Sequence, residues 1–512
     1  MMTASINAEP LALSPLFADH AVLQRDMKVP VWGVAEPGSR IVVEFAGKKA
    51  SAKVDADGRW KAVLPALDAS AEGRDMTVTE TAVDGTESAK TISDILVGDV
   101  WVCSGQSNMQ FELDRADGAA DFIATSENPN IRLFQMQGAI EFEPAKDLRG
   151  DWKLCNPETT PKFSAIAYLF ARDIQPRINV PVGLVHASQG WTPGEAWMSR
   201  ESLMGEPSLR YLVEAWDKLT EDFPRLSEEH RQKMEEWQKA ADAAKEKGEE
   251  PPPQPQGPVD PRFLHRACGF YNGCIAPMTD LAMRGVIWYQ GETNDSRGHE
   301  YRVMFPALIK GWRKAWRRDF PFLFVQVAAV LPPDPEPVPS EWAELRESQA
   351  MALALPKTGM ACTIDIGERD DVHPKNKLEA ARRLALTARA RVYGEKVVDC
   401  GPMFKKAKFA DGKAIVSFTG VAGGLVAKGG ELATFQVAGE DQKFVYASAK
   451  IDGDKVVVWS DAVTSPVAVR YAWNNNPEGC NLYNSEGLPC VPFRSDDWPC
   501  KTLDSHKSFI TP

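Results

Sequence analysis

The sequence lacks an apolar run long enough to cross a membrane. Its longest apolar stretch, residues 320–332, is only about a dozen residues long and includes Gln326, whereas a membrane-spanning helix needs about 18 to 20 residues. Residues 1–15 also lack the basic and apolar regions of a secretory signal. We therefore expect no membrane partner, and either a cytoplasmic protein or a periplasmic or extracellular one whose signal peptide is absent from this sequence.

The sequence also has too few basic residues to favour nucleic acid. It contains 59 Lys and Arg against 71 Asp and Glu, which gives a formal net charge of −12. A fold this acidic gains no general electrostatic attraction to nucleic acid or to anionic lipid. We therefore exclude nucleic acid as a partner.

Cysteine is sparse and poorly spaced for metal binding. Nine cysteines are spread over 512 residues and none forms a C-x-x-C pair, so we expect no structural zinc site. Two groups, Cys268 with Cys274 and Cys480 with Cys490 and Cys500, are spaced closely enough to accept disulfides in an oxidising compartment. Buried free thiols are the alternative for most of them.

What the sequence does contain is typical of a folded protein with several domains. Apolar residues make up 44% and charged residues 25% of the chain, close to the average of globular proteins. At about 150 residues per domain, a chain of 512 residues accommodates roughly three domains. The order of strand-like and helical runs along the chain indicates where these domains lie.

Short β-type runs occupy both ends of the chain. From residue 16 to about 91 they alternate with glycine-containing turns, a pattern typical of an antiparallel β-sandwich, and similar runs return from about residue 401. We therefore predict an N-terminal β-sandwich domain at residues 1–93 and a C-terminal β-rich domain at residues 399–512.

Between these ends, apolar strands alternate with helical stretches, which favours a parallel sheet with helices on both faces. We predict this α/β domain at residues 94–398, with a helical insertion at about 205–260. Two helices are expected in the insertion, 209–219 and 227–247, the second capped by Ser227, and the insertion is expected to pack on the rim without chemistry. The predicted strands are 99–103, 182–187, 285–289 and 320–330.

The first candidate for chemistry is Ser107. It follows the predicted strand 99–103 across a turn that contains Gly105, and a helix is expected to begin there. Ligand sites of α/β sheets lie at this carboxyl end of the strands. Ser107 is therefore a candidate nucleophile, with its own N–H as a donor to an oxyanion, and the alternative is a simple helix N-cap.

The second candidate is His373, in the run Asp370-Asp371-Val372-His373-Pro374. Pro374 suits the first position of a helix and favours an extended conformation for the residue before it. The imidazole is then expected at the mouth of a loop beside carboxylates, where it can accept a proton from a serine. The alternative is a surface histidine without chemistry.

Two further polar runs follow predicted strands. Residues 288–294 read WYQGETN, and an amide after a strand is a candidate donor to an oxyanion. Residues 186–197 contain Gly190, whose N–H is another candidate donor. The sequence has no G-x-S-x-G elbow, P-loop, dinucleotide fingerprint or H-E-x-x-H motif.

Taken in order, these four motifs resemble the sialate O-acetylesterase branch of the SGNH (GDSL-like) hydrolases. The matching runs are GQSNM from Gly105, Gly190 with the EAW that starts at Glu195, WYQGExN from Trp288 and DVHPxNK from Asp371. This resemblance implies a flavodoxin-like three-layer α/β/α catalytic domain between two β-sandwich domains, and a serine esterase that removes O-acetyl groups from carbohydrates.

The resemblance also implies roles for single residues. Ser107 is the expected nucleophile and His373 the expected base, and Gly190 and Asn294 are expected to complete the oxyanion hole with the Ser107 N–H. The acid is Asp370 by the spacing common in the superfamily or Asp371 by that of closer relatives. We expect Gln106, Asn108, Gln290 and Glu292 to bind substrate, and expect no metal or organic cofactor.

The substrate stays open between acetylated sialic acids and acetylated plant polysaccharides such as xyloglucan or xylan. Two other functions remain as alternatives. One is a non-catalytic carbohydrate-binding protein on a hydrolase core, and the other is an SGNH lipase or thioesterase. The presence of Ser107, His373 and Asn294 favours the esterase.

Overall fold

The N-terminal part of the chain forms antiparallel sheets, as its turn pattern predicts. The structure is a computed structural model that describes residues 11–505. One sheet has the order β1 (Ala12–Leu13), β3 (Val29–Val34) and β6 (Arg59–Leu64). A second contains β4 (Arg40–Phe45), β5 (Lys48–Lys53), β7 (Ser70–Thr81) and the first half of β8 (Glu87–Gly105), beside which β2 (Val22–Gln24) pairs. Alternate residues of β4 and β6 are buried in a common core.

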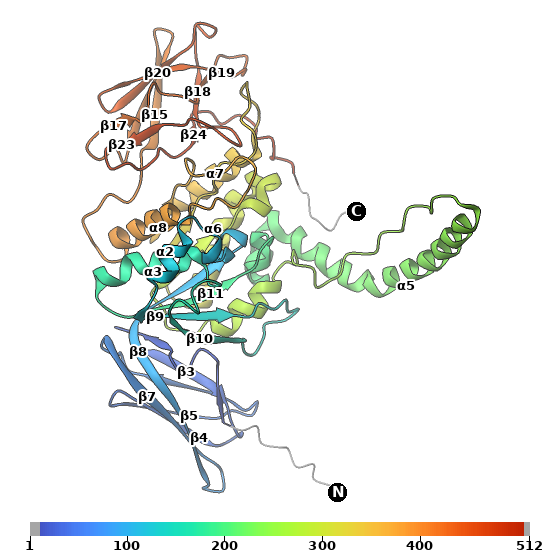
Figure 1. Ribbon diagram of the computed structural model, residues 1–512, viewed down its shortest axis with the longest axis vertical. Helices are drawn as coiled ribbons and strands as arrows, with labels where there is room; N and C mark the ends of the chain where they lie inside the picture. The colour runs from blue at the N-terminus through green and yellow to red at the C-terminus, as the bar shows by residue number, and fades with distance from the viewer. Residues whose placement is uncertain (1–10, 506–512) are drawn as a thin grey trace.

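Strand β8 joins this region to the central sheet. Its first half pairs with β7, and its second half lies between β11 (Val182–Ser188) and β12 (Gly285–Tyr289). Figure 1 shows β8 running from the lower sheets into the middle of the molecule. The predicted boundary between residues 93 and 94 therefore falls inside one continuous strand, because the same backbone is hydrogen-bonded in both regions.

The central sheet has the order β10 (Gly150–Cys155), β9 (Asn128–Met136), β11, β8, β12, β13 (Phe322–Val325) and β14 (Thr358–Ala361). All neighbours pair in parallel except β10 with β9. Helices α3 (Ala165–Ile178) and α8 (Lys377–Arg391) share one apolar core, whereas α6 (Gly298–Ala315) and α7 (Glu341–Met351) contribute to the other. The prediction of a parallel sheet with helices on both faces is confirmed.

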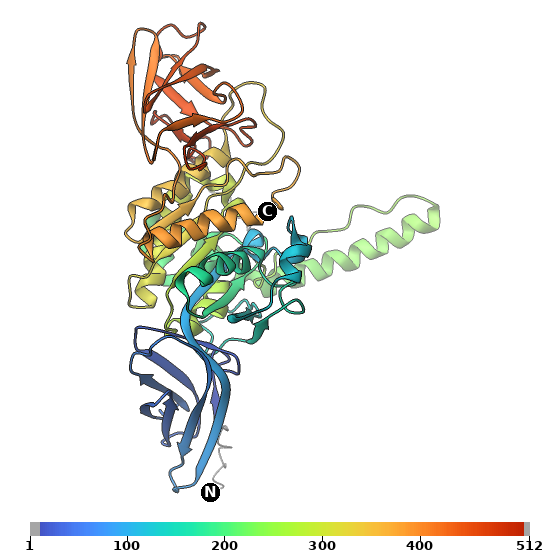
Figure 2. The ribbon, with the colours of Figure 1, turned by 60° about the vertical axis from the view of Figure 1, so that its left-hand side comes forward.

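The insertion differs from its prediction. One helix, α5 (Arg210–Lys247), spans both predicted helices and includes Pro224, so Ser227 is not an N-cap. Ion pairs one turn apart span the proline and follow it, with Arg225 bonded to Asp222 at 3.2 Å and to Glu229 at 2.7 Å, and they support the uninterrupted helix. The far half of α5 projects from the molecule in both views instead of packing on the rim (Figures 1 and 2).

The C-terminal region is all β, as predicted. One sheet has the order β15 (Met403–Ala410), β16 (Lys413–Thr419), β21 (Lys455–Trp459) and β20 (Ser448–Asp452). Another has the order β19 (Val445–Tyr446), β18 (Phe435–Ala438), β22 (Ala468–Tyr471) and β24 (Phe493–Arg494). Strand β17 (Leu425–Ala427) pairs with β23 (Leu482–Asn484).

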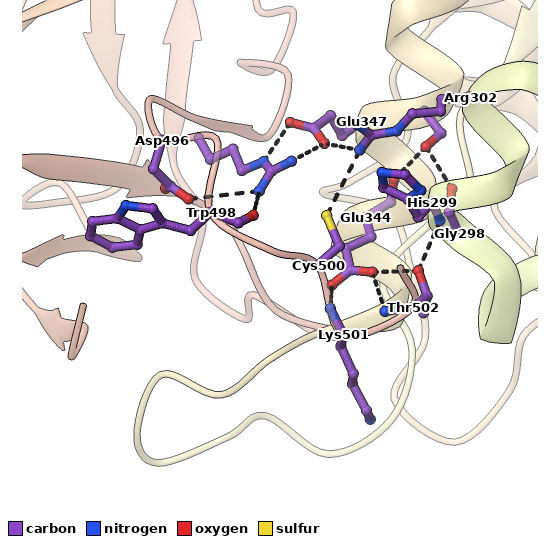
Figure 3. A network of polar contacts seen from close by, with 12 residues as sticks. Gly298, His299, Arg302, Glu344, Glu347, Asp496, Trp498, Cys500, Lys501 and Thr502 are labelled. Carbon is purple, nitrogen blue, oxygen red and sulfur yellow. Dashed lines mark hydrogen bonds and ion pairs between the residues drawn. The ribbon is translucent and has the colours of Figure 1, made fainter. Parts of the chain in front are cut away.

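The chain end returns to the central domain and fixes the C-terminal region on it. The carboxylate of Glu344, a buried residue of α7, accepts hydrogen bonds from the backbone N–H groups of Lys501 and Thr502 at 2.6 and 3.0 Å. Thr502 Oγ1 in turn accepts from the His299 N–H at 2.8 Å. Figure 3 shows this network, in which Arg302 also pairs with Glu347.

All nine cysteines are free thiols, six of them buried, so neither group of closely spaced cysteines is joined by a disulfide. Within residues 11–505, no helix combines the length and the apolar character that a membrane-spanning segment needs.

Candidate active site

The nucleophile turn lies at the centre of the sheet. Strand β8 ends at Gly105 and helix α1 (Ser107–Gln110) begins two residues later. Gly105 has a positive φ of 143°, and a Cβ there would lie 2.1 Å from the Tyr289 carbonyl oxygen, so only glycine permits this approach of β8 to β12. The Gln106 N–H donates to the same carbonyl at 2.9 Å. Ser107 is thereby held at the carboxyl end of β8.

The structure brings Ser107 and His373 together from positions 266 residues apart. His373 Nε2 lies 2.8 Å from Ser107 Oγ, and His373 Nδ1 lies 3.0 Å from Asp371 Oδ1. Asp371 Oδ1 also accepts from the backbone N–H of His373 at 2.8 Å. Partial burial raises the pKa of the Asp371 carboxyl, but the two bonds from His373 outweigh it, so the pKa lies below its ordinary value.

Of the two candidate acids, only Asp371 contacts the imidazole. The Asp370 side chain is 89% exposed and forms an ion pair with Arg369, whose Nε lies 3.8 Å from Asp370 Oδ1. The turn that carries both is fixed by Glu368, whose carboxylate accepts from the Lys375 N–H at 2.6 Å. Asp370 lies within the tight turn between Glu368 and Asp371, which form an isolated antiparallel bridge, so its side chain faces solvent, whereas Asp371 leaves the turn and faces His373.

Gly190 lies directly beside Ser107. It follows β11, and a Cβ placed on it would be 3.5 Å from the Ser107 Cβ. Its N–H donates to Oε1 of the exposed Gln110 side chain at 2.7 Å, and the described residues provide no acceptor for the Ser107 N–H. The Gly190 N–H thus already binds a carbonyl oxygen, that of the Gln110 side chain.

Asn294 does not take the place predicted for it. Its side chain is fully buried, and its amide nitrogen donates to Glu195 Oε2 at 3.0 Å and contacts Met304 Sδ at 3.7 Å. Its amide oxygen accepts from the Gly194 N–H at 2.9 Å and from Gln290 Nε2 at 2.6 Å. Both amide hydrogens are directed at these neighbours, so the observed geometry provides no donor from Asn294 to an oxyanion.

Two predicted substrate-binding residues are also used inside the protein. Gln290 is fully buried, and its Oε1 accepts from the Tyr301 hydroxyl at 2.8 Å while its nitrogen serves Asn294. Gln106 is buried, and its Oε1 accepts from the N–H groups of Gly291 and Thr293 at 3.2 and 3.4 Å. Both amide oxygens thus satisfy groups of the protein, as buried polar side chains generally do, and substrate binding by the two residues stays a prediction.

The other two, Asn108 and Glu292, form a buried chain with Lys377. Asn108 Nδ2 donates to Glu292 Oε1 at 2.5 Å and to the Val372 carbonyl at 2.9 Å. Asn108 Oδ1 accepts from Lys377 Nζ at 2.5 Å. Asn108 follows Ser107 and Val372 precedes His373, so this side chain ties the nucleophile turn to the histidine loop. Asn108 therefore holds these two segments relative to each other, and its side chain is not exposed to substrate.

Burial dominates the electrostatics of this chain. It lowers the pKa of the Lys377 ammonium to about 7, although Glu292, Asp371 and Glu368 favour the charged form. It raises the pKa of the Glu292 carboxyl, whose Oε2 is buried without a hydrogen bond among the described residues. The sequence analysis assigned no role to Lys377, although it is the last residue of the DVHPxNK run and begins α8.

A second buried network links the site to the insertion. Arg297 is only 1% exposed and pairs with Glu195, the partner of Asn294, and with Glu300 at 2.7 Å. Glu300 also accepts from the Tyr211 hydroxyl of α5 at 2.8 Å. Burial lowers the pKa of Arg297, but the two carboxylates outweigh it and raise the pKa. No sequence pattern signals this network, because its members lie on different elements.

The described residues contain no cluster of three or more His, Cys, Asp or Glu side chains arranged to hold a metal ion. The groups that the structure does assemble at Ser107 are a hydroxyl, an imidazole, a carboxylate and two backbone N–H groups. Together they can perform nucleophilic acyl transfer with general acid–base assistance.

Comparisons with known proteins agree with this chemistry. The family described as "Carbohydrate esterase, sialic acid-specific acetylesterase" matches residues 263–389. A carbohydrate acetylesterase from Xanthomonas citri has a similar crystal structure, with a TM-score of 0.79 and 37% identity over 95% of this chain and 100% of that one. Sialate O-acetylesterase of Rattus norvegicus is 27% identical over 93% of this chain and 92% of its own, and that of Homo sapiens is 27% identical over 90% and 88%.

Proposed function

Since this chain belongs to the sialate O-acetylesterase family of carbohydrate esterases, and is a carboxylic ester hydrolase that acts on carbohydrates, we propose that it removes O-acetyl groups through an acyl-enzyme formed on Ser107. The observation that carries this proposal is the 2.8 Å contact between Ser107 Oγ and His373 Nε2 at the carboxyl end of β8.

In the first half-reaction Ser107 Oγ attacks the carbonyl carbon of the acetyl ester, and its proton passes to His373 Nε2. Asp371 holds the Nδ1–H of the imidazole and stabilises the imidazolium that forms. The negative charge on the carbonyl oxygen is accepted by the N–H groups of Ser107 and Gly190. For this, the substrate oxygen replaces Gln110 Oε1 on the Gly190 N–H, and the Gln110 side chain is exposed and free to move away.

The first half-reaction ends with departure of the sugar and the second with its replacement by water. The His373 imidazolium gives its proton to the sugar oxygen as the C–O bond breaks, which releases the sugar alcohol and leaves acetyl-Ser107. Water then attacks the acetyl carbon while His373 accepts its proton, and the same proton returns to Ser107 Oγ as acetate departs. Neither half-reaction requires an oxidant, a reductant or a further group.

We assign Asn294 a positioning function in place of an oxyanion contact. Its Oδ1 accepts from the Gly194 N–H, and its amide nitrogen donates to Glu195 in the same loop. Asn294 therefore fixes the loop that carries Gly190. Asn108, through Val372, fixes the loop that carries His373. Both residues act on the reacting groups through the backbone that they hold.

The test is acetate release from a panel of acetylated sialosides, acetylated xylans and acetylated xyloglucans, with 4-nitrophenyl acetate as a general ester. We expect release from at least one carbohydrate class, abolished in Ser107→Ala. The substrate with the highest kcat/KM decides between sialic acids and plant polysaccharides. Binding of acetylated sugars without any acetate release contradicts the proposal and favours a non-catalytic carbohydrate-binding protein.

A further inference from the structure

Trp191 is an exposed aromatic residue that follows Gly190, the neighbour of the nucleophile. Its relative exposure is 55%, and it is the only tryptophan among the exposed large apolar side chains of the described residues. It follows Gly190, where a Cβ would lie 3.5 Å from the Ser107 Cβ. Successive Cα atoms are about 3.8 Å apart, so the Trp191 side chain starts from the residue next to the one that neighbours Ser107.

The backbone of Trp191 is held in an unfavourable conformation. Its φ is +58°, in the left-handed region that residues with a Cβ seldom adopt. Such a conformation is energetically unfavourable and persists only where the surroundings impose it. Here Thr192 imposes it, because its buried hydroxyl donates to the Gln189 carbonyl at 2.7 Å and accepts from Trp197 Nε1 at 2.9 Å.

The indole is supported by two rings from another part of the chain. Phe263 and His265 contact it with centroid distances of 5.4 and 4.8 Å and interplanar angles of 90° and 74°. These two rings also contact each other at 4.7 Å. Both lie on the segment that returns from the insertion, so the insertion contributes the support of Trp191. Edge-to-face contacts fix the ring and leave more than half of the residue in solvent.

We propose that Trp191 is the surface on which the sugar ring of the acetylated substrate stacks, which makes it a specificity-determining residue; this inference rests on the proposed function. A pyranose ring presents C–H groups on its faces, and these bury well against an exposed indole. An O-acetyl group attaches to the ring through a single oxygen. When its carbonyl lies at Ser107, the ring therefore lies within reach of the residue after Gly190.

The chemistry of the patch sets the class of ligand. The two rings that contact the indole, Phe263 and His265, support an aromatic face, and such a face recognises the apolar side of a ring. A sugar ring with an uninterrupted C–H face should therefore bind to this surface more tightly than an acyclic acetate ester, which has no ring face to stack.

The experiment compares two substrates in the wild-type protein and three variants. Steady-state kinetics are measured with an acetylated pyranoside and with ethyl acetate, which has the same acyl group and no ring; 4-nitrophenyl acetate is avoided because its own ring stacks. The variants are Trp191→Gly, which relieves the left-handed strain, and Trp191→Phe, which keeps an aromatic face. Val83→Ala, at a 74% exposed apolar residue of the N-terminal region, is the matched control.

We expect Trp191→Gly to raise the KM for the pyranoside about tenfold to a hundredfold more than the KM for ethyl acetate, as for other aromatic anchors. Trp191→Phe should recover most of the loss, and Val83→Ala should match the wild type. Equal changes for the two substrates overturn the inference, and so does an unchanged pyranoside KM in Trp191→Gly. Absence of acetate release by the wild-type enzyme refutes the proposed function instead, so the two failures are distinguishable.

Discussion

The rim of the active site and the layer beneath it contrast in how they use polar side chains. On the rim, the side chains of His373 and Asp371 are 30% and 43% exposed and reach Ser107 from an irregular loop. In the layer beneath, Asn108, Gln290 and Asn294 are fully buried and bonded only to protein groups. All belong to the same sequence motifs, so motif membership does not separate the groups that react from the groups that position them. Burial does, because a buried amide cannot give up its partners to a substrate without a large penalty.

The contrast extends to charge. On the rim, the pKa of Asp371 is lowered, because its bonds to His373 outweigh its partial burial and favour the ionised acid. Beneath it, burial lowers the pKa of Lys377 to about 7 and raises that of Glu292. The rim thus keeps the charge that stabilises an imidazolium, whereas the buried layer disfavours charge on both of its titratable members.

The largest effect is expected on the rim. Ser107→Ala and His373→Ala should each lower kcat by on the order of 10⁴- to 10⁶-fold, because the nucleophile and its base act as a unit. The double variant should be little worse than either single one. The measurement is acetate release at saturating substrate, with circular dichroism to show that the variants fold. Near-normal turnover in Ser107→Ala contradicts the mechanism.

The next effect separates the two adjacent acids. Asp371→Asn should lower kcat by roughly 10²- to 10⁴-fold, because Asp371 orients the imidazole and stabilises its charged form. Asp370→Asn is the matched control and should stay within about twofold of the wild type, since an exposed carboxylate contributes mainly surface charge. If both variants keep full activity, the site is a Ser–His dyad or takes its acid from elsewhere, with Glu292 and Glu368 the next to test.

Asn294→Ala tests whether the buried layer positions or reacts. Removal leaves the Gly194 N–H, a Glu195 oxygen and the Gln290 amide without their partner, at about 1 to 3 kcal/mol for each unsatisfied group. We therefore expect a clear loss of unfolding free energy in urea together with a loss of kcat. An oxyanion contact instead predicts a kcat loss of on the order of 10²- to 10³-fold with an unchanged free energy of unfolding.

The smallest effect is a change in the pH dependence of stability in Lys377→Met. The folded pKa of Lys377, about 7, lies below the ordinary value of 10.5, so between these values the unfolded chain binds more protons than the folded one. The free energy of unfolding from this group therefore rises with pH across that window. Urea unfolding from pH 7 to 9.5 should show this rise in the wild type and in the exposed-lysine control Lys49→Met, and a smaller rise in Lys377→Met. Identical slopes in all three contradict the assignment.

Much of the framework could be predicted from local pattern. Strands 182–188 and 285–289 are short apolar runs bounded by polar residues, and the structure places both in the sheet. Strand β9 was missed because Pro129, Asn130 and Arg132 interrupt its apolar pattern, and its pairing comes from β10 and β11. Helix α5 was predicted as two helices because Ser227 suits an N-cap, whereas the structure continues one helix through Pro224, and ion pairs of Arg225 support it there.

By itself, the sequence determined that Ser107 follows a strand across a glycine turn and that His373 stands before a proline next to two acids. Local backbone chemistry is enough for that, since glycine and proline restrict φ at their own positions. Only the tertiary structure decided that these groups meet at 2.8 Å, that Asp371 and not Asp370 faces the imidazole, and that Asn108 and Asn294 lie in the buried layer. The distant bonded partners of Ser107 and Asn294 lie 99 to 266 residues away, and the two acids differ by their place in one tight turn. Which side of a segment is buried depends on what packs against it, and no local pattern records that.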